Sequence, residues 1–216
     1  MPNSLNNSAF PHLNRIQQIN DSYCGPAALV MLLSHLGIDS DQYTIAKSAD
    51  VLGTIGKHGT TIPQLSQAVI NLYPQLQFWY KYNSTISELS RIVNQHQQPV
   101  GVEWQGVFPD NDDDDDYDPD NDFYTNEDDD DPGHYSVITQ VDTANNIIMI
   151  ADPYIDFAGK DRRFSILQFE RRWWDINEVY DRYTGRRQEV DDFHALFFVT
   201  HKLETFPLQY DMIAAS

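Results

Sequence analysis

The sequence predicts an α+β domain, with helices in its first half and a mostly antiparallel sheet after them. Apolar residues recur at helical spacing through much of the first 96 residues, and short apolar runs bounded by turn residues follow. Runs of helices followed by runs of strands are typical of α+β folds. The 216 residues are 41% apolar, so we expect a single domain over residues 1–216 with its own buried core.

The first predicted helix begins at the only cysteine of the chain, Cys24. Residues 20–22 (Asn-Asp-Ser) are natural capping residues, Pro26 suits a first helical turn, and leucines then recur at helical spacing until Gly37. The free N–H groups and the dipole at the start of a helix favour a negative charge, and so populate the nucleophilic thiolate. A single cysteine is nevertheless often a small buried apolar residue, and that alternative stays open here.

The remaining predicted elements follow in chain order. They are helices at 60–73 and 85–96, strands at 78–82 and 99–104, strands at 134–141 and 146–152, a helix at 165–183, and a last strand at 195–201. Thr85 and Glu88 predict a capping box at the start of their helix. Residues 142–146 (Asp-Thr-Ala-Asn-Asn) separate two strand patterns, so these strands are expected to form a hairpin.

The negative charge of the chain is concentrated in one segment. The formal net charge is −19, but residues 110–131 hold 13 Asp and one Glu without a single Lys or Arg, and the rest of the chain has a net charge of only −5. We treat residues 109–132 as an acidic insertion into the domain. Outside it the composition is that of an ordinary, mildly acidic domain.

Several functional classes are disfavoured by composition. The basic segments RRWWD and TGRR are too short for a phosphate-binding surface, so we expect no nucleic-acid partner. No segment approaches the roughly 18 apolar residues of a membrane span, and the first residues lack the pattern of a signal peptide, so we expect no membrane partner and a cytoplasmic location. One cysteine excludes an intrachain disulfide.

A base and an orienting carboxylate for Cys24 are predicted at the ends of the hairpin. His134 opens one strand, and Asp152 closes the next strand 18 residues later. The hairpin brings these ends side by side, and the even separation allows both side chains on one face. The carboxylate would then hold the imidazole in the tautomer that accepts the thiol proton. Taken alone, Asp152 before Pro153 also fits an ordinary turn.

Gln18 is the candidate oxyanion donor. It lies six residues before Cys24, where its side-chain amide and the Cys24 N–H would share the negative oxygen of a tetrahedral intermediate. An exposed loop amide is the alternative, and the neighbouring Gln17 would take this role if the register differs by one residue.

These residues carry a resemblance to a known family. The segment from Gln18 to Cys24 and Gly25 resembles the Gln-x5-Cys-Gly opening of the C39-type papain-like cysteine peptidases. The segments QPVGVEWQG, GHYSVI, IIMIADP and SILQFERRW resemble later parts of C39-like domains in the same order, over about residues 15–175. The resemblance implies a papain-like fold and a peptide or protein substrate. It also implies Cys24 as nucleophile, His134 as base, Asp152 as orienting carboxylate and Gln18 as oxyanion donor, with no cofactor required.

Two other functions remain as alternatives. C39 leader peptidases are usually part of a membrane exporter, whereas this chain is expected to be a stand-alone peptidase. Tyr23 before the cysteine and the spacing from His134 to Asp152 are also similar to phytochelatin synthases, which transfer γ-glutamylcysteine. The other alternative is a non-catalytic adapter that binds peptide or calcium.

Two interpretations of the acidic insertion are open. One is a solvated, disordered loop held open by charge repulsion. The other is a calcium loop, because oxygen-bearing residues follow the spacing of an EF-hand from its first position to its twelfth: Asp116, Asp118, Asp120, Asp122 and Glu127. Since the insertion leads directly into His134, it is expected to select basic peptides, to gate the cleft or to order on calcium. Its carboxylates would also raise the pKa of His134.

Overall fold

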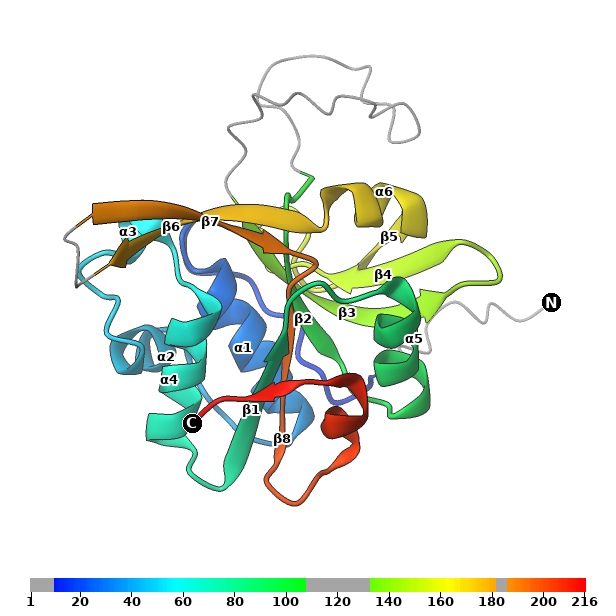
Figure 1. Cartoon of the computed structure of the whole chain (residues 1–216), viewed down its shortest axis with the longest axis horizontal. Coiled ribbons are helices and arrows are strands. Elements are labelled where there is room, and N and C mark those ends of the chain that lie inside the picture. Colours follow the sequence, from blue (N-terminus) through cyan, green and yellow to red (C-terminus); the bar gives the residue numbers. More distant parts are fainter. Residues whose placement is uncertain (1–9, 108–132, 182–185) are drawn as a thin grey trace, which may run out of the picture.

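The computed structural model describes residues 10–107, 133–181 and 186–216, with side chains outside 177–191. Helices α1 to α4 gather on one side of the molecule, and β3 to β5 with α5 lie on the other (Figure 1). The acidic insertion and its predicted calcium ligands lie outside the described residues. The described parts confirm the predicted α+β class.

Helices dominate the first part of the described chain. Their bounds are α1 (Cys24–His35), α2 (Gln42–Ser48), α3 (Ile55–His58), α4 (Ile62–Leu72) and α5 (Ile86–Gln95). Local capping explains several starts: the Asp41 side chain accepts a hydrogen bond from Thr44 N at 2.8 Å, and capping boxes begin α4 and α5. The predicted helices at 60–73 and 85–96 are therefore confirmed, the second with its Thr85 capping box.

The strands form one large antiparallel sheet and a separate two-stranded hairpin. The strands of the large sheet are, in spatial order, β5 (Asp161–Ser165), β4 (Ile147–Ala151), β3 (His134–Asp142), β2 (Val100–Trp104), β8 (Leu196–His201), β1 (Leu76–Lys81) and β9 (Ile213–Ala214). The hairpin consists of β6 (Trp174–Asp181) and β7 (Arg186–Phe193). A short 3-10 helix, η1 (Phe206–Tyr210), precedes β9. The predicted hairpin of β3 and β4 is confirmed.

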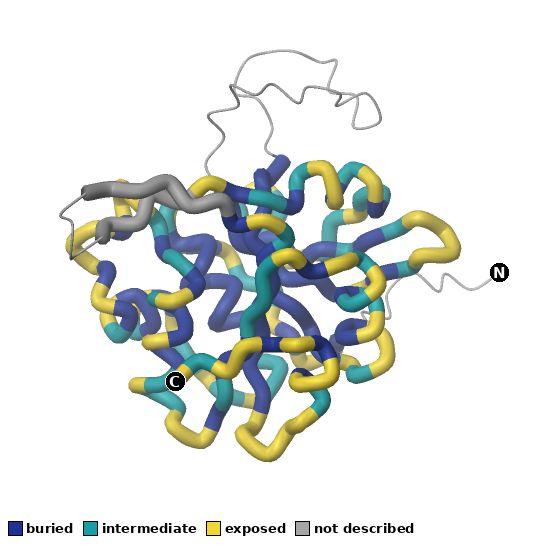
Figure 2. The backbone as a smooth tube through the Cα atoms, in the orientation of Figure 1, coloured by how far each residue is buried: buried dark blue, intermediate teal, exposed yellow. Residues whose placement is uncertain are grey.

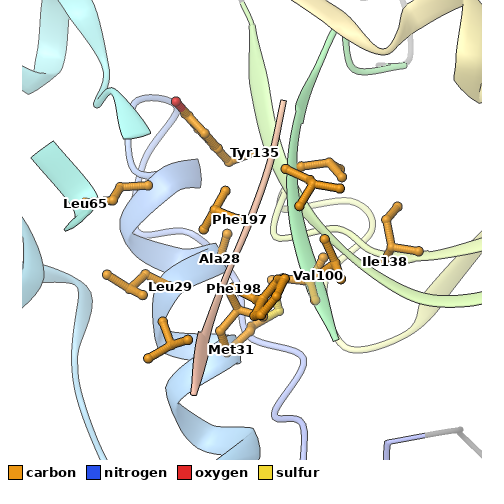
Figure 3. Close-up of a cluster of buried hydrophobic side chains, with 14 of the residues drawn as sticks. Ala28, Leu29, Met31, Leu65, Val100, Tyr135, Ile138, Phe197 and Phe198 are labelled. Carbon is orange, nitrogen blue, oxygen red and sulfur yellow. The ribbon is translucent and has the colours of Figure 1, made fainter. Parts of the chain in front are cut away.

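The main core lies between α1 and the centre of the sheet. Helix α1 packs against β2, β3 and β8, and its residues from Cys24 to Leu33 are all buried (Figure 2). In Figure 3, Ala28 and Met31 of α1 lie near Phe197 and Phe198 of β8. Each large apolar side chain buried in this way contributes about 1.5–3 kcal/mol. This packing holds the start of α1 against the start of β3, where the candidate site lies.

The predicted helix over 165–183 is wrong beyond its first half. Helix α6 covers only Ile166–Arg172, begun by a Ser165 capping box, and the chain then turns into strand β6. Residues 174–181 pair with β7 along their whole length, so cross-strand hydrogen bonds replace the helical ones. The β7 partner was not predicted, and without it the aromatic and charged residues of this segment read as a helix.

Candidate active site

Cys24 is the first residue of α1 and is buried. The predicted side-chain caps do not form: Tyr23 is the N-cap and makes no side-chain capping bond. Instead, Asn20 closes a tight turn by accepting from Ser22 N through its side chain, at 3.0 Å, and from Tyr23 N through its carbonyl, at 3.1 Å. The helix ladder opens with Ala27 N donating to Tyr23 O, so the Cys24 N–H precedes it.

Gly25 allows α1 to start in close contact with its surroundings. A Cβ atom at this position would collide with the Thr60 hydroxyl and would lie 3.3 Å from the Tyr135 ring. Thr60 precedes α4, and Tyr135 belongs to β3. Only glycine lets the helix approach both elements this closely.

His134 is the first residue of β3 and pairs with Trp104 of β2. The ring is buried, with its Nε2 atom 2.8 Å from Asp152 Oδ1. A hydrogen bond to Cys24 also acts on this ring, and Nδ1 is the nitrogen left for it. The structure thus brings together Cys24 from the start of α1, His134 from the start of β3 and Asp152 from just after β4.

The pKa of His134 reflects these neighbours. Burial by itself would lower it, but the charge and hydrogen bond of Asp152, followed by those of Cys24, outweigh the burial and raise the pKa of His134 to about 10. The imidazolium form is therefore favoured at neutral pH. A protonated histidine beside a thiol stabilises the thiolate.

Asp152 directly follows β4, and its side chain is fully buried. Oδ1 accepts from His134 Nε2 and from Tyr154 N at 3.0 Å, while Oδ2 accepts from Arg162 Nη1 at 2.6 Å. Burial would raise the pKa of Asp152, but the charge and hydrogen bond of His134, the Tyr154 N–H and the charge of Arg162 lower it to about 2. The carboxylate is thus ionised.

Gln18 is buried, whereas Gln17 is exposed. The Gln18 backbone N–H donates to Pro153 O at 2.8 Å, which places it beside the residue that follows Asp152. Its side-chain Nε2 donates to Asn20 O at 2.9 Å, so the amide is hydrogen-bonded to the turn that leads into Cys24. Gln17 instead uses its carbonyl to accept from Gln42 Nε2 at 2.7 Å.

A second group of buried acidic residues adjoins the same strands. Glu103 of β2 lies opposite Tyr135 of β3, and Gln105 Nε2 donates to Asp175 Oδ1 at 3.1 Å. Burial, and then the charge of Asp192, raise the pKa of Asp175 to about 6, although hydrogen bonds with the Ile176 N–H, Glu103 and Gln105 oppose this rise. Burial and the charge of Glu103 likewise raise the pKa of the Tyr135 hydroxyl.

Sequence reasoning identified neither Arg162 nor this acidic group. Arg162 lies on β5, a strand without an apolar pattern, and it reaches Asp152 only through the pairing of β5 with β4. A basic residue ten positions after a candidate catalytic Asp was the only signal present. Glu103 and Asp175 lie 72 positions apart in the chain, so no local pattern links them.

Neither metal sites nor membrane spans are found in the described ranges. Within residues 10–107, 133–181 and 186–216, the side chains described include no cluster of three His, Cys, Asp or Glu arranged to hold a metal. The helices of the same ranges all fall short of the length and apolarity that a membrane span requires. Calcium binding by the acidic insertion remains a prediction.

Comparison with known proteins points to one family. A model of the Peptidase C39-like family matches residues 9–180. A search of curated protein sequences finds no match.

Three solved structures share the fold. A C39-like peptidase from Bacillus anthracis is 18% identical, covers 86% of this chain and 94% of its own, and has a TM-score of 0.56. The peptidase domain of Streptococcus ComA, a bifunctional ABC transporter of a quorum-sensing pathway, is 18% identical, with 87% and 97% covered and a TM-score of 0.54. A double-glycine-motif protease of an AMS/PCAT transporter, solved with its leader peptide, is 14% identical, with 87% and 90% covered and a TM-score of 0.50.

Proposed function

Because the chain belongs to the C39-like peptidase family and is a cysteine peptidase, we propose that it hydrolyses peptide bonds with a Cys24, His134 and Asp152 triad. One observation supports this proposal most strongly: the buried pair of His134 Nε2 and Asp152 Oδ1 at 2.8 Å, whose imidazole also interacts with Cys24. The arrangement provides a nucleophile, a base and an orienting carboxylate, each hydrogen-bonded to the next.

The proposed reaction proceeds through an acyl-enzyme. His134 Nδ1 holds the Cys24 thiol proton, and the thiolate attacks the peptide carbonyl. When the tetrahedral intermediate collapses, the C–N bond breaks and His134 passes its proton to the leaving amine. A water molecule then loses a proton to His134 and attacks the thioester, which breaks the C–S bond, releases the carboxylic acid and restores the Cys24 thiolate beside protonated His134.

Two N–H groups are proposed to hold the oxyanion. One is the Cys24 backbone N–H, which lies ahead of the helix ladder. The other is the Gln18 side-chain amide, which uses one of its two N–H bonds on Asn20 O and keeps the second. Burial of Gln18 and exposure of Gln17 favour Gln18 for this role over its neighbour.

The substrate is a peptide, and the acidic insertion gives the basis for proposing basic peptides. Its 14 carboxylates within 22 residues attract Lys and Arg side chains, and the segment ends three residues before His134. Calcium held by the residues from Asp116 to Glu127 is part of the same proposal, because a bound Ca²⁺ would offset part of this negative charge and order the segment. Deletion of residues 110–131 tests both ideas. A digest of a peptide library that is unchanged by the deletion, in calcium and in chelator, would contradict them.

The nucleophile is tested with Cys24→Ala. This variant is expected to lose peptidase activity completely, since no other thiol exists in the chain. For the same reason, alkylation by iodoacetamide reports on Cys24 alone, and the folded protein should react at neutral pH. Unchanged hydrolysis by Cys24→Ala, or a folded protein that resists alkylation, would overturn the proposal.

The γ-glutamyl transferase alternative forms the same acyl-enzyme and differs in the acceptor. Mass analysis of products formed with glutathione distinguishes the two: a peptidase gives hydrolysis products from peptides and no γ-glutamylcysteine oligomers. Oligomers formed from glutathione would favour the transferase.

A further inference from the structure

The second oxygen of Asp152 has a dedicated partner. Oδ1 accepts the two hydrogen bonds from His134 and Tyr154, whereas Oδ2 lies 2.6 Å from Arg162 Nη1. The Asp152 side chain has no solvent exposure, so water does not replace these donors. The carboxylate is therefore held at both oxygens by protein groups.

Arg162 is itself held rigidly. It lies opposite Ile150 in the pairing of β5 with β4, and its Nη2 atom donates to Val107 O at 2.8 Å. Its Cζ atom lies 3.5 Å above the Phe157 ring and 4.8 Å from the Phe164 ring. A planar guanidinium stacked on aromatic rings and bonded at two nitrogens has little freedom to move.

This geometry constrains the direction of the Asp152 carboxylate. Rotation of the carboxylate about its own axis would break the Oδ2 bond to Arg162 together with the Oδ1 bonds, so Oδ1 stays directed at His134. The positive charge also favours the ionised carboxylate in a buried place where a neutral acid would otherwise be preferred. An ionised, fixed acceptor is what keeps the histidine in its productive tautomer.

We propose that Arg162 is a positioning residue of this peptidase, which aims Asp152 at His134 and keeps Asp152 ionised. The inference rests on the proposed triad. The charged and titratable groups that act on Asp152 are His134 of β3 and Arg162 of β5, and Cys24 of α1 acts through His134. Arg162 thus acts on the reaction through Asp152 and touches no reacting atom.

The chain contains a matched control, the pair of Arg15 and Asp161. Arg15 Nε and Nη2 donate to the two Asp161 oxygens at 2.7 and 3.0 Å. The two arginine side chains are similarly buried, with 13% exposure for Arg15 and 12% for Arg162. Asp161 and Arg162 are adjacent on β5, but Asp161 contacts Thr139 rather than the triad. Arg15 also donates from Nη1 to Phe10 O and Leu13 O, as Arg162 donates from Nη2 to Val107 O. Loss of Arg15 therefore reports what the loss of a comparable part-buried arginine does away from the triad.

The experiment compares Arg162→Met, Arg162→Lys and Arg15→Met in the full chain, with kcat, KM and the pH profile measured on a peptide substrate. Arg162→Met is expected to lower kcat roughly 10- to 100-fold, as the loss of an outer-shell partner does in metal sites, with KM nearly unchanged. Its acid limb should move to higher pH, because Asp152 then gains a proton more easily. Arg162→Lys keeps the charge and should leave the acid limb of the pH profile near its native position. Arg15→Met should leave both kcat and this acid limb unchanged.

Two outcomes would overturn the inference. One is a native kcat in Arg162→Met. The other is a loss of activity with an unshifted acid limb, matched by Arg15→Met, which would make Arg162 a structural residue only. If Arg162→Met does not fold, Arg162→Lys decides, because a folded lysine variant with a shifted acid limb contradicts the charge role. Asp152→Asn measured in parallel separates the proposed triad from the proposed role of Arg162. If Asp152→Asn is also fully active, the triad itself is wrong.

Discussion

His134 and Tyr135 are neighbours on β3, yet they adjoin two buried acidic groups whose pKa values are shifted in opposite directions. Asp152, beside His134, accepts from cationic and N–H donors, and its pKa falls to about 2. On the side of Tyr135, Asp175 has other carboxylates among its neighbours, and its pKa rises to about 6. Burial raises the pKa in both places, so the partners decide the charge. The comparison separates a carboxylate that stays ionised down to about pH 2, as the orientation of an imidazolium requires, from one that gains a proton already near pH 6.

The strongest test of this contrast is Asp152→Asn. An amide cannot stabilise the imidazolium and favours the wrong tautomer of His134, so kcat should fall by about 10³–10⁴-fold. The pKa of His134 is raised chiefly by Asp152, so the alkaline limb of the kcat/KM profile, near pH 10 in the native protein, should move to lower pH. The measurement is a pH series of peptide hydrolysis.

Asp175→Asn is the matched control for this variant, since it makes the same chemical change in the other acidic group. It should leave kcat and the alkaline limb nearly unchanged. Equal losses in the two variants would contradict the distinction between the two groups.

The stability of the same two variants should change in opposite directions. Asp175 has a folded pKa of about 6 against 3.8 for the free group, so the folded state binds more protons between these values and loses stability as the pH rises through them. Asp175→Asn should therefore be more stable than the native protein above pH 6, by at most about 3 kcal/mol. Near pH 4 this gain should disappear. Urea unfolding at both pH values measures it.

For Asp152 the sign is reversed. Its folded pKa of about 2 lies below 3.8, so it contributes stability above pH 3.8 that is lost as the pH falls toward 2. Asp152→Asn should be less stable than the native protein at neutral pH. If both variants shifted stability in the same direction, the assigned charge states would be wrong.

A smaller effect is expected from Gly25→Ala, which tests the packing on the Tyr135 side. The added methyl group collides with Thr60 and presses on Tyr135, so a loss of about 1–3 kcal/mol is expected from overpacking. The shifted helix start should also slow alkylation of Cys24. Thermal unfolding and the iodoacetamide rate measure the two effects.

Gly53→Ala provides the control for that substitution, because nothing lies within 4 Å of a Cβ atom at Gly53. Its stability and alkylation rate should remain close to native. If Gly25→Ala were equally harmless, the close approach of α1 to Thr60 and Tyr135 would not matter for the site.

Much of the candidate site was predictable because its parts carry local signals. Cys24 at a helix start follows from turn residues before it and leucines after it, and the approach of His134 to Asp152 follows from the hairpin. Their common face also depends on a register shift between Ile138 and Gln140, which was not predicted. The error over 174–181 arose where the local signal was ambiguous. Whether residues 174–181 form a strand depends on their pairing with β7. The sequence of β7 is itself polar and charged, so it gives no local sign of this pairing.

The sequence by itself determined the α+β class, the helix that presents Cys24 and the hairpin that presents His134 and Asp152, because periodicity and turn chemistry act between residues close in the chain. Only the tertiary structure decided that Arg162 lies on the second oxygen of Asp152, that Gln18 rather than Gln17 is buried, and that carboxylates gather beside Tyr135. These features depend on contacts between distant segments. Their energies come from burial and from partners that no local pattern specifies.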